Sequence, residues 1–371
     1  MPRAKASSPL YASFEGPVST MYAELVERNR SEGQLLPGTP GSLALRERPG
    51  SGSYWYRRYY LLPKLPQVED YVCTLDEHVA HGAMSNRIEL AVWSQEQVRM
   101  LRTLGMQVAD KDAALVLVEM HNRGLFSAGL VLVGTLAYMA WLNEFGVRAV
   151  SSRTQDIDLA RRHALKLATP VSFMEAVQAT RLGFSAVPGG LSPSSPPSSV
   201  KRPGREGLRV DVLTSGPELG RVVHLPELDW YARSVPYFDY LLSSPRQAAM
   251  LAGGHCVPVN APAPERLAWH KLYSSTRRAS DTAKAEKDLR QAATLLAVLV
   301  ERDNLGLSTT VKAVPKEVLD AARQRLPALQ NLLEPHPHAL NEVERALHGT
   351  ARMAIRQATP VQEAGDPSAG S

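Results

Sequence analysis

The chain has 371 residues, 44% of them hydrophobic and 21% charged, which are the proportions of an ordinary soluble globular protein with two or three subdomains and exclude a disordered chain. Its formal net charge is +5 and its pI is near 9.2. This positive balance suits an anionic partner such as a nucleotide or a nucleic acid, but it is also common in proteins without that role.

The N-terminal part predicts one helix and one aromatic strand. Residues 1–16 have no apolar stretch, so we expect a disordered start without a signal peptide. Residues 18–29 carry apolar side chains at helical spacing, and residues 34–50, rich in Gly, Pro and Arg, predict a loop. Residues 53–60 predict a strand with interleaved aromatic and basic residues. Such a strand either stacks on bases and grips phosphates, or caps a small sheet with its arginines in water.

Helices and strands alternate through the middle of the chain, which predicts an α/β core. We expect strands at 128–133 and 155–160 and helices at 86–109, 113–122, 136–144 and 171–181. The stretch 186–206 is rich in Ser, Pro, Gly and basic residues, so we expect a flexible insertion there that does not pack.

Residues 124–143 contain no charged side chain and are long enough to span a bilayer. Gly124, Gly129 and Gly134 interrupt this stretch, and no positive cluster marks one flank. A strand that ends at Gly134 and is followed by a buried helix explains the stretch better. We therefore expect no membrane span.

The last third of the chain predicts mainly helices. Short strands are expected at 222–224 and 257–259, and helices start at Pro264 and continue at 283–300, 315–333 and 339–347. Cys73 and Cys256 are far apart and lack the paired spacing of zinc ligands, which fits a reducing, cytoplasmic setting.

The expected fold class is α/β (α+β), with a small mixed sheet flanked by helices, an N-terminal helix and β-hairpin region, and a C-terminal helical subdomain. The expected boundaries are 1–16 for a disordered N-terminus, 17–109 for the helix and aromatic hairpin region, 110–225 for the core with its insertion at 186–206, 226–355 for the mostly helical subdomain and 356–371 for a disordered tail.

Three aspartates in the core carry the clearest chemical pattern. Asp156 and Asp158 stand two residues apart on an expected strand and point to one face, while Ile157 points to the other. Asp211 lies in a later apolar strand. Three carboxylates on one face repel one another unless a cation lies between them, and the usual one is a divalent metal with oxygen ligands. The alternative is that these aspartates face water at a sheet edge.

Gly134 and Thr135 follow an apolar strand and open a helix. Gly134 lets the backbone approach a phosphate, and the amides at the start of the helix would hold that phosphate together with the Thr135 hydroxyl. Asp156 and Asp158 would bind Mg²⁺ (or Mn²⁺) at the triphosphate, and Asp211 would hold a second metal or activate the attacking hydroxyl.

These motifs resemble the DNA polymerase beta-like nucleotidyltransferase superfamily, whose signature is Gly-Ser, a spacer, Asp-x-Asp and a third Asp on a neighbouring strand. Within it, the chain is similar to a bacterial group of nucleotidyltransferase-domain proteins. The similar segments are Tyr54-Trp55-Tyr56, Val133-Gly134-Thr135, Asp156-Ile157-Asp158-Leu159, Val210-Asp211-Val212-Leu213 and Ala268-Trp269-His270-Lys271-Leu272. The resemblance implies the nucleotidyltransferase fold. Thr135 in place of the commoner Ser, and a longer spacer before Asp156, depart from the pattern.

Abortive-infection nucleotidyltransferase toxins are more distant relatives by this resemblance. Their helical half carries a Lys, then Arg residues, then a Lys-Asp pair, and a similar order is formed here by Lys271, Arg277, Arg278, Lys287 and Asp288. The first four of these would bind the nucleotide, with Lys271 neutralising the β- or γ-phosphate. The alternative is a solvated helix face with an ion pair between Lys284 and Asp288.

The sequence therefore predicts a cytoplasmic, metal-dependent enzyme that moves a nucleoside monophosphate from an NTP to a hydroxyl on RNA, a protein or a small molecule. A role in toxin–antitoxin systems or phage defence would follow only from kinship. One alternative is a nucleotide- or nucleic-acid-binding regulator without turnover, which would use the aromatic strand and the basic residues at 201–205. A minor alternative is a scaffold whose hairpin docks a partner protein. The sequence leaves the acceptor, the base preference and the oligomeric state open.

Overall fold

The structure is a computed structural model that describes residues 8–50, 52–150, 154–189, 195–278 and 281–358. The chain divides into two compact units. The larger unit is Tyr11–Leu267, and the smaller unit combines Met1–Leu10 with Ala268–Ser371. Each unit has its own core.

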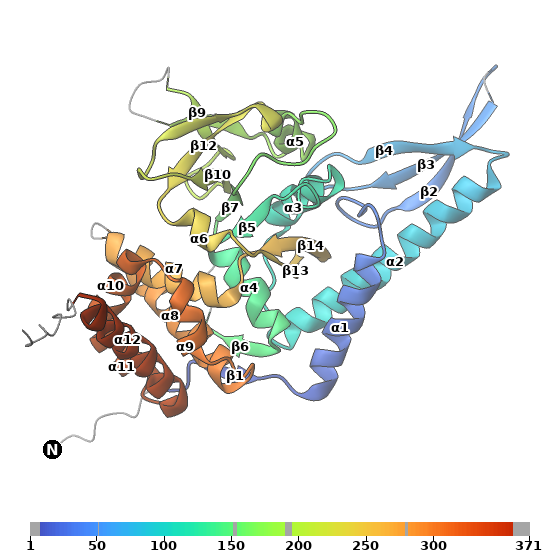
Figure 1. Ribbon diagram of the computed structural model, residues 1–371. Coiled ribbons are helices and arrows are strands. Elements are labelled where there is room, and N and C mark those ends of the chain that lie inside the picture. The colour runs from blue at the N-terminus through green and yellow to red at the C-terminus, as the bar shows by residue number, and fades with distance from the viewer. Residues whose placement is uncertain (1–7, 51, 151–153, 190–194, 279–280, 359–371) are drawn as a thin grey trace, which may run out of the picture. The chain divides into compact units, whose positions relative to one another are not determined.

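Within the described residues, the larger unit contains a seven-stranded mixed sheet (Figure 1). Its strands are β5 (Val131–Val133), β7 (Asp156–Arg161), β8 (Ser185–Pro188), β9 (Pro197–Lys201), β10 (Arg209–Ser215), β11 (Val222–Leu225) and β12 (Trp230–Val235). The main path runs β11-β12-β10-β7-β5. β10 is parallel to β7 and β12 and antiparallel to β9, so three strands meet it.

Hydrophobic helices and a hairpin supply the core beside this sheet. The hairpin consists of β13 (Arg246–Ala252) and β14 (His255–Ala261), and the helices and turns are α3 (Lys111–Asn122), α4 (Gly134–Glu144), α5 (Phe173–Ala179), η1 (Pro226–Leu228) and α6 (Phe238–Leu241). α4 is buried from Thr135 to Asn143, because nearly all of its residues are apolar and both sides find packing partners. Ser172 caps α5 by accepting a hydrogen bond from the Glu175 amide.

The N-terminal part of the larger unit adds two helices and two small sheets. The elements are β1 (Tyr11–Ser13), α1 (Gly16–Arg30), β2 (Ser42–Arg48), β3 (Gly52–Tyr59), β4 (Val68–Thr74), α2 (His78–Thr103) and β6 (Val147–Ala149). β1 pairs with β6, and β2, β3 and β4 form an antiparallel sheet. Tyr22 and Leu25 of α1 pack with Leu101 of α2, Leu251 and Cys256 in one buried cluster.

The smaller unit is helical in its described part. It contains most of α7 (Pro264–Arg277), then α8 (Thr282–Glu301), α9 (Leu307–Thr310), η2 (Val311–Ala313), α10 (Lys316–Gln324), α11 (Leu326–Leu333) and α12 (Pro337–Ala358). Asp281 caps α8 by accepting a hydrogen bond from the Lys284 amide. His336 ties Leu10 to this unit, because its Nε2 accepts a hydrogen bond from the Leu10 amide and its Nδ1 contacts Glu301.

The predicted α/β (α+β) class is confirmed, and most predicted elements exist with shifted ends. The helix expected at 86–109 is α2, which starts at His78 and ends at Thr103. The helix expected at 315–333 is two helices, α10 and α11. Pro327 stands at the start of α11, where its missing amide proton costs no hydrogen bond.

Three predicted irregular segments are wrong in part. Residues 42–48 of the expected loop form β2, which pairs along its length with β3. Residues 11–13 of the expected disordered start form β1. Residues 356–358 of the expected tail belong to α12, while residues 359–371, like residues 1–7, lie outside the described part of the chain.

The insertion predicted at 186–206 is the most consequential of these errors. Half of the described part of this stretch forms β8 and β9, and Val200 is fully buried beside Val210 of β10. The Ser and Pro content is typical of a loop, so the sequence did not predict this strand. The small side chains of Ser198 and Ser199 are buried in it. Residues 190–194 lie outside the described part.

No helix in the described part of the chain is long and apolar enough to cross a membrane. The uncharged stretch at 124–143 is divided instead between a turn, β5 and α4.

Candidate active site

The sheet register brings two of the three predicted aspartates side by side. β7 and β10 are parallel neighbours, and Asp158 of β7 is the register partner of Asp211 of β10. Adjacent strands lie about 4.8 Å apart, so these two residues start from neighbouring backbone positions. Asp156 stands two residues before Asp158, with Arg209 as its own partner on β10. All three aspartates therefore lie on one face of the sheet.

The opposite face of the same strands is core. Ile157 and Leu159 of β7 and Val210 and Val212 of β10 are at most 1% exposed, while the three aspartates are only partly buried. This alternation fixes the direction of the carboxylates, because a shift of one residue would bury charge and expose four large apolar side chains.

The turn at Gly134 is pressed against one of the carboxylates. Val133 pairs with Asp158 across β5 and β7, and Gly134 opens α4 with a φ of +70°. A Cβ on Gly134 would lie 2.2 Å from Asp158 Oδ2. Only glycine fits here, because a side chain would meet both a strained backbone and an occupied space. Thr135, the next residue, is buried at the start of the helix.

Asp211 is surrounded by donors that the sequence did not single out. Arg209 Nε donates to Asp211 Oδ1 at 3.0 Å, and the Ser199 hydroxyl donates to the same oxygen. Arg233 of β12 forms a longer ion pair with this oxygen at 3.7 Å. Arg209 and Arg233 also donate to Ser199 Oγ, at 2.7 and 3.2 Å, and Arg233 donates to Ser198 Oγ at 3.0 Å. Two guanidinium groups and a hydroxyl therefore hold one carboxylate.

These arginines change the electrostatics expected from the sequence. The sequence alone predicts that three carboxylates on one face need a metal to offset their repulsion. Arg209 and Arg233 offset part of it with positive charge from the protein itself. The sequence offered a signal for Arg209, which shares the face of Asp211 two residues away, but Ser199 was hidden in the serine-rich stretch.

The residue types at this face suit a divalent metal, since Mg²⁺ and Mn²⁺ bind carboxylate oxygens. Asp156, Asp158 and Asp211 are the groups that would hold it. Among the residues that the structure describes, however, no three His, Cys, Asp or Glu side chains are gathered closely enough to form a metal site. Asp211 is directed instead to its arginines. The donor chemistry of this face fits a divalent metal.

The predicted basic residues of α7 and α8 belong to the smaller unit. Lys271 Nζ lies 3.0 Å from Asp288 Oδ1, and Arg278 Nε lies 3.1 Å from Asp288 Oδ2. The Lys271 and Asp288 side chains are only 5% and 6% exposed. Arg277 lies over the ring of Tyr273. Lys287 contributes favourable charge to Asp288.

The surface pair considered for Asp288 is thus wrong. Asp288 is buried and pairs with Lys271 and Arg278, while Lys284 lies nearest Asp281. Burial raises the pKa of Asp288, but the positive charges of Lys271 and Arg278 outweigh it and hold this pKa below its ordinary value. The sequence order of these residues reflects a buried ion-pair network within the smaller unit.

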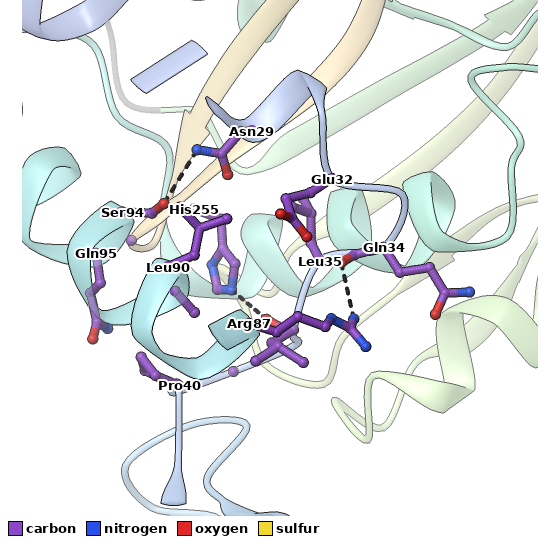
Figure 2. Close-up of a pocket in the computed structure, with 14 residues that line it drawn as sticks. Asn29, Glu32, Gln34, Leu35, Pro40, Arg87, Leu90, Ser94, Gln95 and His255 are labelled. Atoms are coloured by element: carbon purple, nitrogen blue, oxygen red, sulfur yellow. Dashed lines mark hydrogen bonds between the residues drawn. The ribbon is translucent and has the colours of Figure 1, made fainter. Parts of the chain in front are cut away.

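A pocket lies elsewhere in the larger unit (Figure 2). It is partly open to solvent and is lined by α1, the 32–40 segment, α2 and the β13–β14 turn. Arg87 donates to the Gln34 carbonyl, Asn29 donates to Ser94, and His255 Nε2 lies 3.0 Å from the Leu36 carbonyl. The bonds of Arg87 and His255 fasten the 34–36 segment, and the Asn29 bond joins α1 to α2. The pocket is separate from the aspartate face of β7 and β10.

Comparison with known proteins decides the family. A family model described as nucleotidyltransferase matches residues 111–315, which is more than half of the chain. The chain belongs to this nucleotidyltransferase family. The matched region begins at α3 and contains every predicted site residue, from Gly134 to Lys287.

Other comparisons add little to this assignment. No curated protein matches the chain. Among solved structures, an antigenic nucleotidyltransferase-like protein from Paracoccidioides brasiliensis is similar, with 15% identity over 63% of this chain and 91% of its own. The TM-score of that match is 0.35, which is too low to support any inference about the site.

Proposed function

We propose that this nucleotidyltransferase moves a nucleoside monophosphate from an NTP to a hydroxyl acceptor in a metal-dependent reaction of the DNA polymerase beta type. The observation that carries the proposal is the register pairing of Asp158 with Asp211, beside the Gly134 turn and inside the family region. An acidic sheet face next to a helix start suits a triphosphate with its cation.

In this reaction the acceptor hydroxyl loses its proton to solvent, and its oxygen attacks the α-phosphorus of the NTP. The bond between that phosphorus and the oxygen bridging to the β-phosphate breaks, and pyrophosphate leaves. A divalent cation held by Asp156, Asp158 and Asp211 would offset negative charge on the attacking and leaving oxygens. The amides at the start of α4 and the Thr135 hydroxyl would bind a phosphate oxygen.

Arg209 and Arg233 fix the direction of the Asp211 carboxylate on this face. Asp211 is therefore assigned as a ligand and orienting group in the proposal, since a carboxylate already accepting from Ser199 and Arg209 has less capacity to take a proton. Nucleotide binding by Lys271, Arg277, Arg278 and Lys287 stays a separate hypothesis about the smaller unit, where Lys271 and Arg278 already pair with Asp288.

The test measures pyrophosphate release and transfer of label from each α-labelled NTP to total RNA and protein, with Mg²⁺ or Mn²⁺. The double change Asp156→Ala and Asp158→Ala should lower transfer by on the order of a thousand-fold or more, because metal-ligand loss removes several kcal/mol of transition-state stabilisation. Asp76→Ala, which removes an exposed carboxylate after β4, should leave transfer unchanged. Equal activity of the double variant would refute the proposal.

A second candidate is a nucleotide-binding regulator without turnover, and one observation favours it. Asp211 is already held by Arg209, Arg233 and Ser199, which is an arrangement that needs no metal. The basic stretch considered for nucleic acid gives this candidate less support, because Arg202 pairs with Asp112 of α3. NTP binding without label on any acceptor would favour the regulator.

A further inference from the structure

The sheet formed by β2, β3 and β4 has one face packed against the rest of the larger unit. Trp55 of β3 packs against His81 of α2 with ring centroids 4.5 Å apart and the ring planes tilted by 55°. Arg57 is 2% exposed and donates to the carbonyls of Pro37, Thr39 and Pro40. Because side chains alternate along β3, the residues between these must point the other way.

The other face carries three tyrosines and three arginines, which we call the Tyr–Arg face: Arg46, Arg48, Tyr54, Tyr56, Arg58 and Tyr71. The strand register sets Arg46 opposite Tyr54 and Tyr56 opposite Tyr71. Tyr71 is 55% exposed, and the Arg46 side chain is 52% exposed. The face therefore presents rings and guanidinium groups side by side on neighbouring strands.

The rings form a connected group. The Tyr71 ring centroid lies 6.2 Å from that of Tyr54 and 5.9 Å from that of Tyr56, at steep angles. The Arg48 guanidinium lies 5.8 Å from both the Tyr54 and Tyr56 centroids and donates to the Tyr56 hydroxyl at 2.8 Å. Because these side chains already hold one another in place, binding a ligand costs less side-chain conformational entropy.

The charge of this face is positive. Glu69 is the register partner of Arg58 and forms an ion pair with Arg46 at 2.5 Å. Asp70 is the register partner of Arg57 and hydrogen-bonds to Tyr59, on the packed face. Glu77, which follows β4, is a second carboxylate that acts on Tyr71. Three arginines thus stand against two carboxylates, so the face keeps a positive charge to balance an anion.

We propose that the Tyr–Arg face binds single-stranded RNA. Unpaired bases stack on exposed aromatic rings, and the phosphates between them are neutralised by interspersed arginines. An apolar protein partner would need a continuous apolar patch, whereas this face alternates rings with charge. The inference does not rest on the proposed transfer reaction, because RNA binding here needs neither NTP nor metal.

The test is fluorescence anisotropy of the full-length protein with a labelled mixed-sequence RNA of about 12 nucleotides, within the usual site size of such surfaces. EDTA is present and nucleotide is omitted, so failure of the transfer reaction would not affect the result. Tyr71→Ala and Tyr54→Ala should each weaken binding about fivefold to a hundredfold, because each removes a stacking ring. Tyr71→Phe should bind as the wild type does, since it keeps the ring.

Two controls match these variants. Tyr60→Ala removes an exposed tyrosine that follows β3, and Arg99→Gln removes an exposed arginine of α2; neither should change the affinity. Arg48→Gln should weaken binding and lower the salt slope by about 0.7, the value for one phosphate contact on a single strand.

The proposal is overturned if the wild type binds no RNA at low salt, which would favour a protein partner for this face. It is equally overturned if Tyr71→Ala and Tyr60→Ala bind alike, or if DNA of the same sequence binds more tightly than RNA. Circular dichroism of each variant shows whether the fold is retained.

Discussion

At the residue scale, Gly134 and Asp158 are the tightest local constraint at the proposed site. The φ of +70° and the 2.2 Å distance from an added Cβ to Asp158 Oδ2 act together. The sequence pattern predicts that Gly134 lets the backbone approach a phosphate. The close neighbour in the structure is a carboxylate, so the glycine also permits the β5–α4 turn to pass Asp158.

Gly134→Ala should lower both stability and any transfer activity. The positive φ alone costs about 1–2 kcal/mol, and displacement of the Asp158 carboxylate adds to this. Gly124→Ala is the matched control, because Gly124 has a φ of +71° but nothing within 4 Å of a Cβ. Thermal unfolding and pyrophosphate release compare the two; equal losses would show that Asp158 is not constrained by this turn.

Lys271 and Asp288 are the second residue-scale constraint, and their pairing predicts a large effect. Asp288→Ala should destabilise the protein by about 3–5 kcal/mol, because it leaves the Lys271 charge buried without its partner. Asp320→Ala, which breaks a surface pair with Arg323, should cost no more than about 1 kcal/mol. Urea unfolding measures both, and similar costs would mean that the Lys271–Asp288 pair is solvated.

At the scale of elements, β9 completes the proposed site. It supplies Ser199 to Asp211 and lies along the same edge of β10 that β12 occupies further on. Ser198, Ser199 and Val200 are buried in this strand. If the segment were a mobile insertion, Asp211 would lose the hydrogen bond that Ser199 donates. The third aspartate therefore depends on an element that composition alone assigned to a loop.

Val200→Asp tests whether β9 is a packed strand. A carboxylate at this fully buried position has no partner, so the variant should be strongly destabilised or insoluble. Ala186→Asp places the same group on the exposed neighbouring position of β8 and should be tolerated. Melting temperatures of the two variants test this prediction. If Val200→Asp melts at the same temperature as Ala186→Asp, the interpretation of this stretch as a flexible insertion is correct after all.

At the scale of the whole molecule, three partly buried titratable groups link stability to pH. Burial lowers the pKa of His255 and of His121 below the ordinary 6.5, since each must remain neutral in its packed surroundings. Burial raises the pKa of Glu144 above the ordinary 4.5. Between pH 4.5 and pH 6.5, acidification therefore lowers the stability of the fold through the histidines and raises it through Glu144.

For a histidine whose folded pKa is depressed, the unfolded chain binds more protons as the pH falls below 6.5. Its stabilising contribution is present above 6.5 and is lost on acidification. The Glu144 contribution is present below 4.5 and is lost as the pH rises through the folded pKa. Two histidines against one glutamate should make the protein less stable at about pH 5.5 than at pH 7.5.

Urea midpoints across this range measure the effect. His255→Gln should flatten the dependence, because one of the two depressed groups is gone. His78→Gln, at an exposed position at the start of α2, should leave the slope as it is. A steeper slope in His255→Gln would show that His255 is charged in the folded protein.

Several features could be read from the chain because they depend on local sequence. The α/β class, the helices α1, α3, α4 and α8, and strand β3 follow from apolar spacing and from breakers such as Gly134 and Pro264. The placement of Asp156 and Asp158 on one face also follows, since alternation along a strand needs no partner.

Other features depended on contacts between distant segments. The strand register sets Asp211 beside Asp158, 53 positions earlier. Arg233 reaches Asp211 across 22 positions, and Lys271 is buried with Asp288 across 17. Local patterns carry no information about contacts at that range. β9 shows the same limit: Ser and Pro disfavour a strand locally, but pairing with β8 and β10 on both sides supplies the hydrogen bonds that stabilise it.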